Sequence, residues 1–216
     1  MQERLAKNTK ITLSILFCFI GLILVFFTYF DTIKREVFNR KNIELLEQQI
    51  ILNDVPDFIE VSQPGVENPI PNPDPVVSSE DTYIGYLEVP VINLKRGFLS
   101  LESKYNSINY NVQLIKGSTM PNVENSNLIL AAHRGNSSIS YFHNLYKLEL
   151  GNEAIIHYNN IKYTYKLVNI YLEDKDGTVA IKRNGHVKGL TLITCTKEDS
   201  TKQSVYIFEL VSEEGE

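Results

Sequence analysis

The strongest constraint on the fold of this chain is an uncharged run of twenty residues near its N-terminus. Residues 11–30, ITLSILFCFIGLILVFFTYF, contain no Asp, Glu, Lys or Arg. At a rise of about 1.5 Å per residue, a helix of this length matches a hydrocarbon core about 30 Å thick. The run ends in bulky aromatic residues instead of a small-residue cleavage site. We therefore expect residues 11–30 to form an uncleaved transmembrane anchor after a short tail, residues 1–10.

The rest of the chain divides into three segments by composition. Residues 31–52 place Ile, Val and Leu at helical spacing between charges, which predicts a juxtamembrane helix. Residues 53–80 hold six of the eight prolines and six acidic residues but no Lys or Arg. This composition predicts an extended acidic linker, with a lid over an active site as the other interpretation. Residues 81–216 are enough for one compact domain.

Residues 81–216 are patterned as short strands. Alternating or apolar runs bounded by Gly, Asn, Pro and Asp are typical of an all-β domain. Eight such runs favour a closed barrel or a sandwich. Apolar residues on one face of residues 139–148 predict a short helix between the strands. The predicted strands are 83–89, 91–94, 110–115, 128–132, 153–157, 162–172, 189–195 and 203–211.

Composition and motif spacing argue against several classes of function. The formal net charge is -5, and the latter half has no basic cluster that would bind a phosphate backbone, so we expect no nucleic-acid partner. Cys18 and Cys195 lie too far apart for a disulfide scaffold or a zinc site. No HxH, HxxxH or GxGxxG motif occurs, so no metal site or phosphate-binding loop is expected.

Cys195 and His133 are the candidates for chemistry. Cys195 ends the apolar run GLTLITC and precedes the polar loop TKEDSTK. A thiol at a strand end is held on rigid backbone yet is reachable by substrate, although a buried structural thiol is the alternative. A thiol needs a partner base, and His133 ends another apolar run, LILAAH. The other histidines, His143, His157 and His186, have no companion of functional type.

Several ordered motifs resemble those of the sortases. TLITC is similar to the strand that carries the sortase cysteine, and NLILAAHRG with FHNLYKLELGN to the histidine region. IGYLEVPVIN and KGSTMP resemble the first strand and the segment before the histidine strand, so the resemblance spans residues 83–210. It implies an eight-stranded β-barrel with one or two short helices. It also implies a membrane-anchored transpeptidase that cleaves an LPXTG-type sorting signal of a secreted protein.

The resemblance also implies roles for individual residues. Cys195 would be the nucleophile that forms a thioester, and His133 the acid that protonates the departing amide nitrogen. Thr194 would help to shape the substrate site. The thioester would then pass to an amine of a peptidoglycan precursor at the Gram-positive cell wall or, as the runner-up, to a pilin lysine.

One residue of the family pattern is missing. The family commonly has an arginine on the strand after the cysteine loop, but no arginine follows Arg183 here. Matching that strand places Gln203 at the arginine's position as a neutral catalytic donor, with Lys202 beside it as a charged substrate contact. Because neighbouring strand residues face opposite ways, at most one of the two is expected at the site. The remaining candidates are Arg134 and Arg96.

Other classes of cysteine enzyme fit the sequence less well. Papain-like enzymes place Cys before His, the caspase signature QACxG is missing, and ITC does not match the SxGC run of the L,D-transpeptidases. The main alternative is a catalytically impaired sortase-like module that binds sorting signals or serves as a membrane-tethered scaffold. Within the family, class A or D is expected more than class B, with the barrel outside the cell. No cofactor is expected, although calcium bound by acidic loops such as residues 171–177 is a family possibility.

Overall fold

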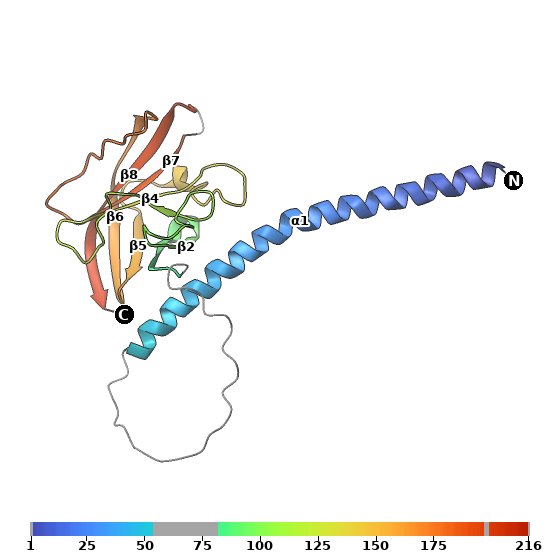
Figure 1. The fold of residues 1–216 in the computed structure, drawn as a ribbon. Coiled ribbons are helices and arrows are strands. Elements are labelled where there is room, and N and C mark those ends of the chain that lie inside the picture. Colours follow the sequence, from blue (N-terminus) through green and yellow to red (C-terminus); the bar gives the residue numbers. More distant parts are fainter. Residues whose placement is uncertain (1, 54–81, 197–198, 216) are drawn as a thin grey trace, which may run out of the picture. The chain divides into compact units, whose positions relative to one another are not determined.

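The fold is taken from a computed structural model of the chain, which describes residues 2–53, 82–196 and 199–215 (Figure 1). The chain divides into two compact units, Met1–Lys41 and Asn42–Glu216. The predicted linker falls on residues 54–81, outside the described residues, so the linker and lid interpretations both stay predictions.

A single helix, α1 (Gln2–Asn53), contains both predicted helical segments. Its stretch Thr12–Gln48 is long and apolar enough to cross a membrane, with a mean hydropathy of 2.6 in its most apolar window. None of that window is buried in the structure. Such an N-terminal apolar helix is compatible with a single-pass membrane anchor.

The second unit is an all-β barrel of eight strands, which confirms the predicted fold class. Neighbouring strands are hydrogen-bonded in the order β2-β1-β5-β6-β8-β7-β4-β3. A bridge between Phe98 and Val112 links the two edges, so the barrel is nearly closed. Long strands β6 and β8 lie side by side in Figure 1 and pair antiparallel, whereas β4 and β7 pair in parallel. The strands are β1 (Gly85–Val89), β2 (Leu94–Phe98), β3 (Gln113–Leu114), β4 (Asn127–Ala131), β5 (Glu153–Tyr158), β6 (Ile161–Asp174), β7 (Gly189–Cys195) and β8 (Lys202–Gly215).

Alternation along β4 and β7 separates two hydrophobic clusters. Even-numbered residues such as Leu130 and Leu192 belong to the main barrel core. Odd-numbered Ile129 and Ile193 belong to a second cluster, which the segment after β6 covers with Val179 and Ile181. Because successive strand side chains point to opposite faces, the odd-numbered ends of these strands lie on the face of the second cluster.

Two predicted elements differ from the structure. The strand predicted at 91–94 is instead the 3₁₀ turn η2 (Pro90–Ile92), and the strand starts at Leu94. Pro90 has no N–H to give to a ladder, and Asn93 has a left-handed φ of 52°, so both residues favour a turn. The helix predicted at 139–148 is a series of turns that ends in η3 (Leu145–Lys147). Its buried side chains, Phe142, Leu145 and Leu148, recur every three residues, the period of a 3₁₀ turn.

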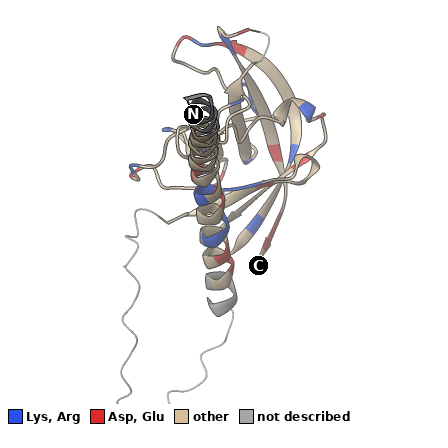
Figure 2. Cartoon of the chain, turned by 90° about the vertical axis from the view of Figure 1, so that its right-hand side faces the viewer, with Lys and Arg blue, Asp and Glu red and all other residues tan. Residues whose placement is uncertain are grey.

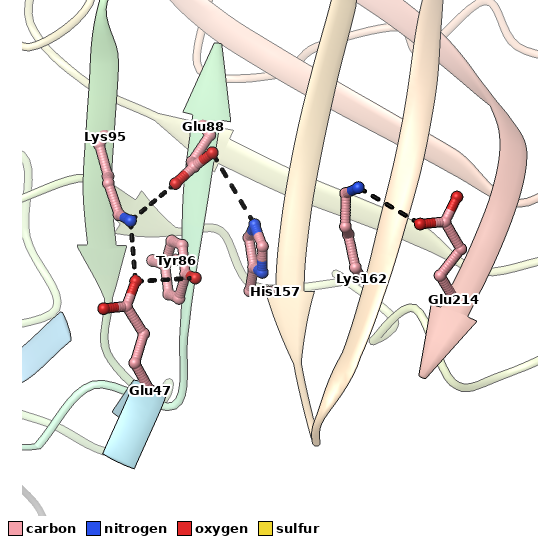
Figure 3. Close-up of polar contacts among 7 residues, drawn as sticks. All are labelled: Glu47, Tyr86, Glu88, Lys95, His157, Lys162 and Glu214. Carbon is pink, nitrogen blue, oxygen red and sulfur yellow. Dashed lines mark hydrogen bonds and ion pairs between the residues drawn. The ribbon is translucent and has the colours of Figure 1, made fainter. Parts of the chain in front are cut away.

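The last part of α1 packs within the barrel unit. Ile43 is buried in a small cluster with Tyr83, Tyr86 and Leu99. One turn later, Glu47 accepts a hydrogen bond from Tyr86 and an ion pair from Lys95, as Figure 3 shows. The barrel unit therefore includes residues of α1 from Asn42 onward.

Candidate active site

The parallel pairing of β4 with β7 brings the two predicted chemical residues to adjacent strand ends. Ala131 pairs with Ile193, and the Ala132 N–H donates to the Ile193 carbonyl at 3.3 Å. His133 follows the end of β4 by two residues, and Cys195 is the last residue of β7, so the two residues belong to neighbouring strand ends. Cys195 is an odd-numbered strand position and therefore lies on the face of the second cluster. Each of the two residues is partly exposed, so a substrate can approach it.

Cys195 is contacted by a residue that the sequence analysis did not single out. The ammonium of Lys175 donates a hydrogen bond to Cys195 Sγ at 3.1 Å. Lys175 directly follows β6, and its backbone N–H donates to the Thr201 carbonyl at 2.8 Å, just before β8. Strand β8 lies between β6 and β7 and pairs with both. Lys175, at the end of β6, therefore lies near the end of β7, where Cys195 is.

His133 is held from two sides. Its carbonyl accepts the N–H of Phe142 at 3.1 Å, which ties the residue to the turns after β4. Its ring Nε2 lies 3.3 Å from Asn109 Oδ1. Since that oxygen is an acceptor, the contact favours a proton on Nε2. The contact ties the ring of His133 to the segment before β3.

Gln203 lies directly opposite Cys195 in the β7–β8 pair. Its amide nitrogen donates to the Asp174 carbonyl at 3.3 Å and to the Thr178 carbonyl at 3.4 Å. The side chain thus lies at the cysteine end of the sheet, but its donor contacts backbone oxygens of β6 and of the following segment. Lys202 pairs with Asp174 in the ladder, and its ammonium lies 4.0 Å from that carboxylate.

Thr194 lies on the opposite side of β7 from Cys195. Its side chain is buried, and its hydroxyl donates to the Ala132 carbonyl at 2.9 Å. This bond links β7 to β4 one residue before the cysteine and one before the histidine. In this structure Thr194 fixes the spacing of the two strand ends.

The arginines contact other groups. The guanidinium of Arg96 stacks on Tyr141 at 4.6 Å from the ring centre, and that of Arg134 on Tyr146 at 5.0 Å. Arg183 donates to three backbone carbonyls, those of Asn125, Asn184 and Val187. Among the described residues, the cation that the structure places on the thiol is a lysine.

Lys175 and Asn109 were missed because their contacts are long-range. They lie 20 and 24 residues from Cys195 and His133, respectively. Lys175 stands in the loop that the sequence analysis considered only for its acidic groups. Within the described parts of the chain, no three His, Cys, Asp or Glu side chains gather as metal ligands would.

Comparisons with known proteins identify sortases among the solved structures of similar fold. The solved structures similar to this chain include sortase A from Corynebacterium diphtheriae, with 17% identity and a TM-score of 0.55 over 62% of this chain and 63% of that protein. Sortase C from Streptococcus pneumoniae has 20% identity and a TM-score of 0.54, over 60% of this chain and 69% of that one. The Clostridium perfringens sortase D5 transpeptidase has 22% identity and a TM-score of 0.50, over 61% of this chain and 80% of that protein.

These identities are low, so the likeness to solved structures concerns the fold. The chain matches less than two thirds of the Corynebacterium sortase, 63% of its length. A comparison with curated proteins gave no match. The model of the sortase domain family, however, matches residues 87–210, which is more than half of the chain and includes both His133 and Cys195. The chain therefore belongs to the sortase family, a family of cysteine transpeptidases.

Proposed function

We propose that this protein is a membrane-anchored transpeptidase that cleaves an LPXTG-type sorting signal and transfers the secreted protein to an amine. The observation that supports the proposal is the parallel pairing of β4 with β7, because His133 follows the end of β4 and Cys195 ends β7. Membership of the sortase family supports the reaction class. The apolar helix α1 supports an anchor, with the barrel on the outer side of the cell membrane.

The proposed reaction has two acyl transfers. The thiol proton of Cys195 passes to His133, and the thiolate attacks the carbonyl carbon of the threonine in the sorting signal. The bond between that carbon and the amide nitrogen of the next residue then breaks, and His133 gives the proton to the departing amine. An incoming amine attacks the resulting thioester, loses a proton to His133 and releases the sulfur as thiolate. Gln203 or Lys202 would contact the substrate near the reacting carbonyl, and Thr194 would keep the two strand ends in place.

The substrate and acceptor follow from the family. Secreted proteins with a C-terminal LPXTG-like motif are the proposed donors, and a peptidoglycan precursor is the proposed acceptor. A pilin lysine is the second candidate, because the printed description of the pneumococcal sortase C concerns pilin substrate specificity. We assign the enzyme to class A or D and propose no cofactor for the reaction.

Intact-mass analysis tests the proposal. The full chain in detergent micelles is incubated with a panel of LPXTG-like peptides, beside the Cys195→Ala variant. We expect an adduct of the N-terminal part of one peptide on the wild type and none on the variant. An adduct that persists in Cys195→Ala would disprove the role of Cys195.

A second candidate function is a sortase-like module that binds sorting signals without cleaving them. It is favoured by one observation, namely that a glutamine of β8, and not an arginine, is the ladder partner of Cys195. For such a module we expect peptide binding by calorimetry without any adduct or cleavage. His133→Ala would then leave peptide affinity unchanged, whereas in the enzyme it abolishes turnover.

A further inference from the structure

Lys175 is the residue from which we draw a further inference, which rests on the proposed function and deepens it. Its Nζ lies 3.1 Å from Cys195 Sγ, within the range of a hydrogen bond to sulfur. Two other lysines have acidic partners: Lys182 pairs with Glu173 at 2.7 Å, and Lys202 lies 4.0 Å from Asp174. Among the described residues, no carboxylate forms an ion pair with Lys175, so its charge is directed at the thiol.

The backbone around Lys175 holds it in this position. On one side, its N–H donates to the Thr201 carbonyl at 2.8 Å. On the other side, Asp176 Oδ1 accepts the N–H and the hydroxyl of Thr178 at 2.9 and 2.8 Å, which closes a turn. The backbone of Lys175 is thus held by a hydrogen bond to the residue before β8 and by the turn that Asp176 and Thr178 close.

A cation at this place serves the chemistry of the thiol. A charge-assisted hydrogen bond is about twice as strong as one between neutral groups. Negative charge sits on the sulfur before attack and on the carbonyl oxygen in the tetrahedral intermediate. An ammonium has three N–H donors, so one can stay on the sulfur while another reaches a carbonyl oxygen bound there. Gln203 has no charge, and its amide nitrogen contacts two backbone carbonyls.

We propose that Lys175 is a catalytic residue that supplies the positive charge at Cys195, from the end of β6 instead of from β8. The lysine stays an ammonium throughout and transfers no proton. It stabilises the negative charge first on the sulfur and then on the carbonyl oxygen of the intermediate. The family arginine is thus replaced by a lysine from another strand.

Lys175→Gln is the direct test, with Lys175→Arg as the charge-conserving variant and Lys182→Gln as the matched control on the same segment. All are made in the full chain with Cys18→Ala, in detergent micelles, so that Cys195 is the only thiol. Two rates are measured: alkylation of Cys195 by iodoacetamide at neutral pH, which needs no substrate, and thioester formation with the peptide.

We expect Lys175→Gln to lower the alkylation rate about ten-fold and thioester formation about 100-fold. Lys175→Arg should recover most of the alkylation rate, and Lys182→Gln should match the parent. If Lys175→Gln stays within two-fold of Lys182→Gln in alkylation, the proposal is overturned. If alkylation falls as expected but no peptide acylates even the parent, the charge at sulfur is supported and the proposed transpeptidase function fails instead.

Discussion

Asn109 contacts the ring of His133, so we expect it to orient that ring for the proposed proton transfer. Its Oδ1 lies 3.3 Å from Nε2. Asn109→Ala should lower kcat of peptide cleavage roughly ten-fold and leave KM nearly unchanged, because the ring loses its orienting partner. Asn109→Asp keeps the acceptor oxygen and should recover part of kcat. Steady-state kinetics of the two variants checks this.

The matched control for this positioning role is Asn122→Ala, at an exposed turn residue. Equal kcat values for Asn109→Ala and Asn122→Ala would contradict the role. A rise in KM alone would instead place Asn109 in substrate binding.

Asp176 controls the turn beside Lys175. The backbone N–H of Thr178, and then its hydroxyl, donate to the carboxylate and hold the pKa of Asp176 below its ordinary value. The turn is therefore stabilised above the ordinary pKa of about 3.9 and loses this stabilisation only as the pH falls through the lowered pKa. Asp176→Ala should lower the alkylation rate of Cys195 about three-fold at pH 7, because Lys175 is held less firmly.

Asp176→Asn is the comparison variant, since its side-chain oxygen still accepts both bonds. It should alkylate at nearly the parent rate and keep that behaviour at pH 4. Identical rates for the alanine and asparagine variants would contradict a role of this turn in placing Lys175.

At the scale of residues, the sequence singles out Cys195 and His133 as candidates but does not reveal their contacts. Both residues end apolar runs, and an apolar run that stops at a polar loop can be recognised from the sequence alone. Lys175 reaches Cys195 because β8 pairs with both β6 and β7. Such pairing between strands that are not consecutive depends on the closure of the whole barrel, which no local pattern encodes.

At the scale of elements, the end of α1 is bound into the barrel unit mainly by apolar packing. Ile43 is only 4% exposed.

Burial lowers the pKa of Lys95, but its hydrogen bonds to Glu47 and Glu88 outweigh this, so the net pKa is raised. The stabilisation from this raised pKa is complete below the ordinary lysine pKa of about 10.4 and is lost only at higher pH. Lys95 therefore stays charged at neutral pH, and Figure 3 shows its contacts with Glu47 and Glu88.

The expected loss of stability is larger for the buried Ile43 than for the ion pair of Glu47 with Lys95. Ile43→Ala should lower the free energy of unfolding by about 2 kcal/mol, at the low end for buried residues because the cluster is small. Glu47→Gln should lower it by less than about 1 kcal/mol, since the ion pair with Lys95 is partly exposed. Urea unfolding of the full chain in micelles, followed by near-UV circular dichroism, measures both.

Val37→Ala is the control, because it also shortens an apolar side chain of α1 but at a position that is 59% exposed. An Ile43→Ala variant as stable as Val37→Ala would show that this turn of α1 contributes nothing to the barrel.

Strand positions were predictable where apolar alternation continues to a clear end, as in β7, whose predicted and observed bounds coincide. The error at 91–94 arose because Val91 and Ile92 are apolar although Pro90 and Asn93 set the backbone. The error at 139–148 arose because a spacing of three residues fits a helix and a 3₁₀ turn about equally well in a short segment. In both cases local backbone preference overrode the hydrophobic pattern.

At the scale of the whole molecule, the chain combines an apolar helix with a charged barrel. Large apolar side chains of α1, such as Phe17 and Leu22, are each 66% exposed. Exposed apolar surface of this extent is unfavourable in water and is relieved in a bilayer. Red and blue segments alternate over the strands of the barrel in Figure 2, as expected for a surface in contact with water. Basic residues flank the apolar run on both sides, so charge alone does not set the orientation.

The two cysteines provide a direct test of that orientation, because Cys18 lies in the apolar run and Cys195 in the barrel. In intact cells that express the full chain, a membrane-impermeant maleimide should label Cys195 and not Cys18, since the proposed topology exposes only the barrel to the outside medium. Labelling should survive Cys18→Ala and disappear in Cys195→Ala, as measured by mass after extraction. If Cys195 is labelled only after the cells are lysed, the barrel lies on the cytoplasmic side, and the proposed action on secreted proteins is excluded.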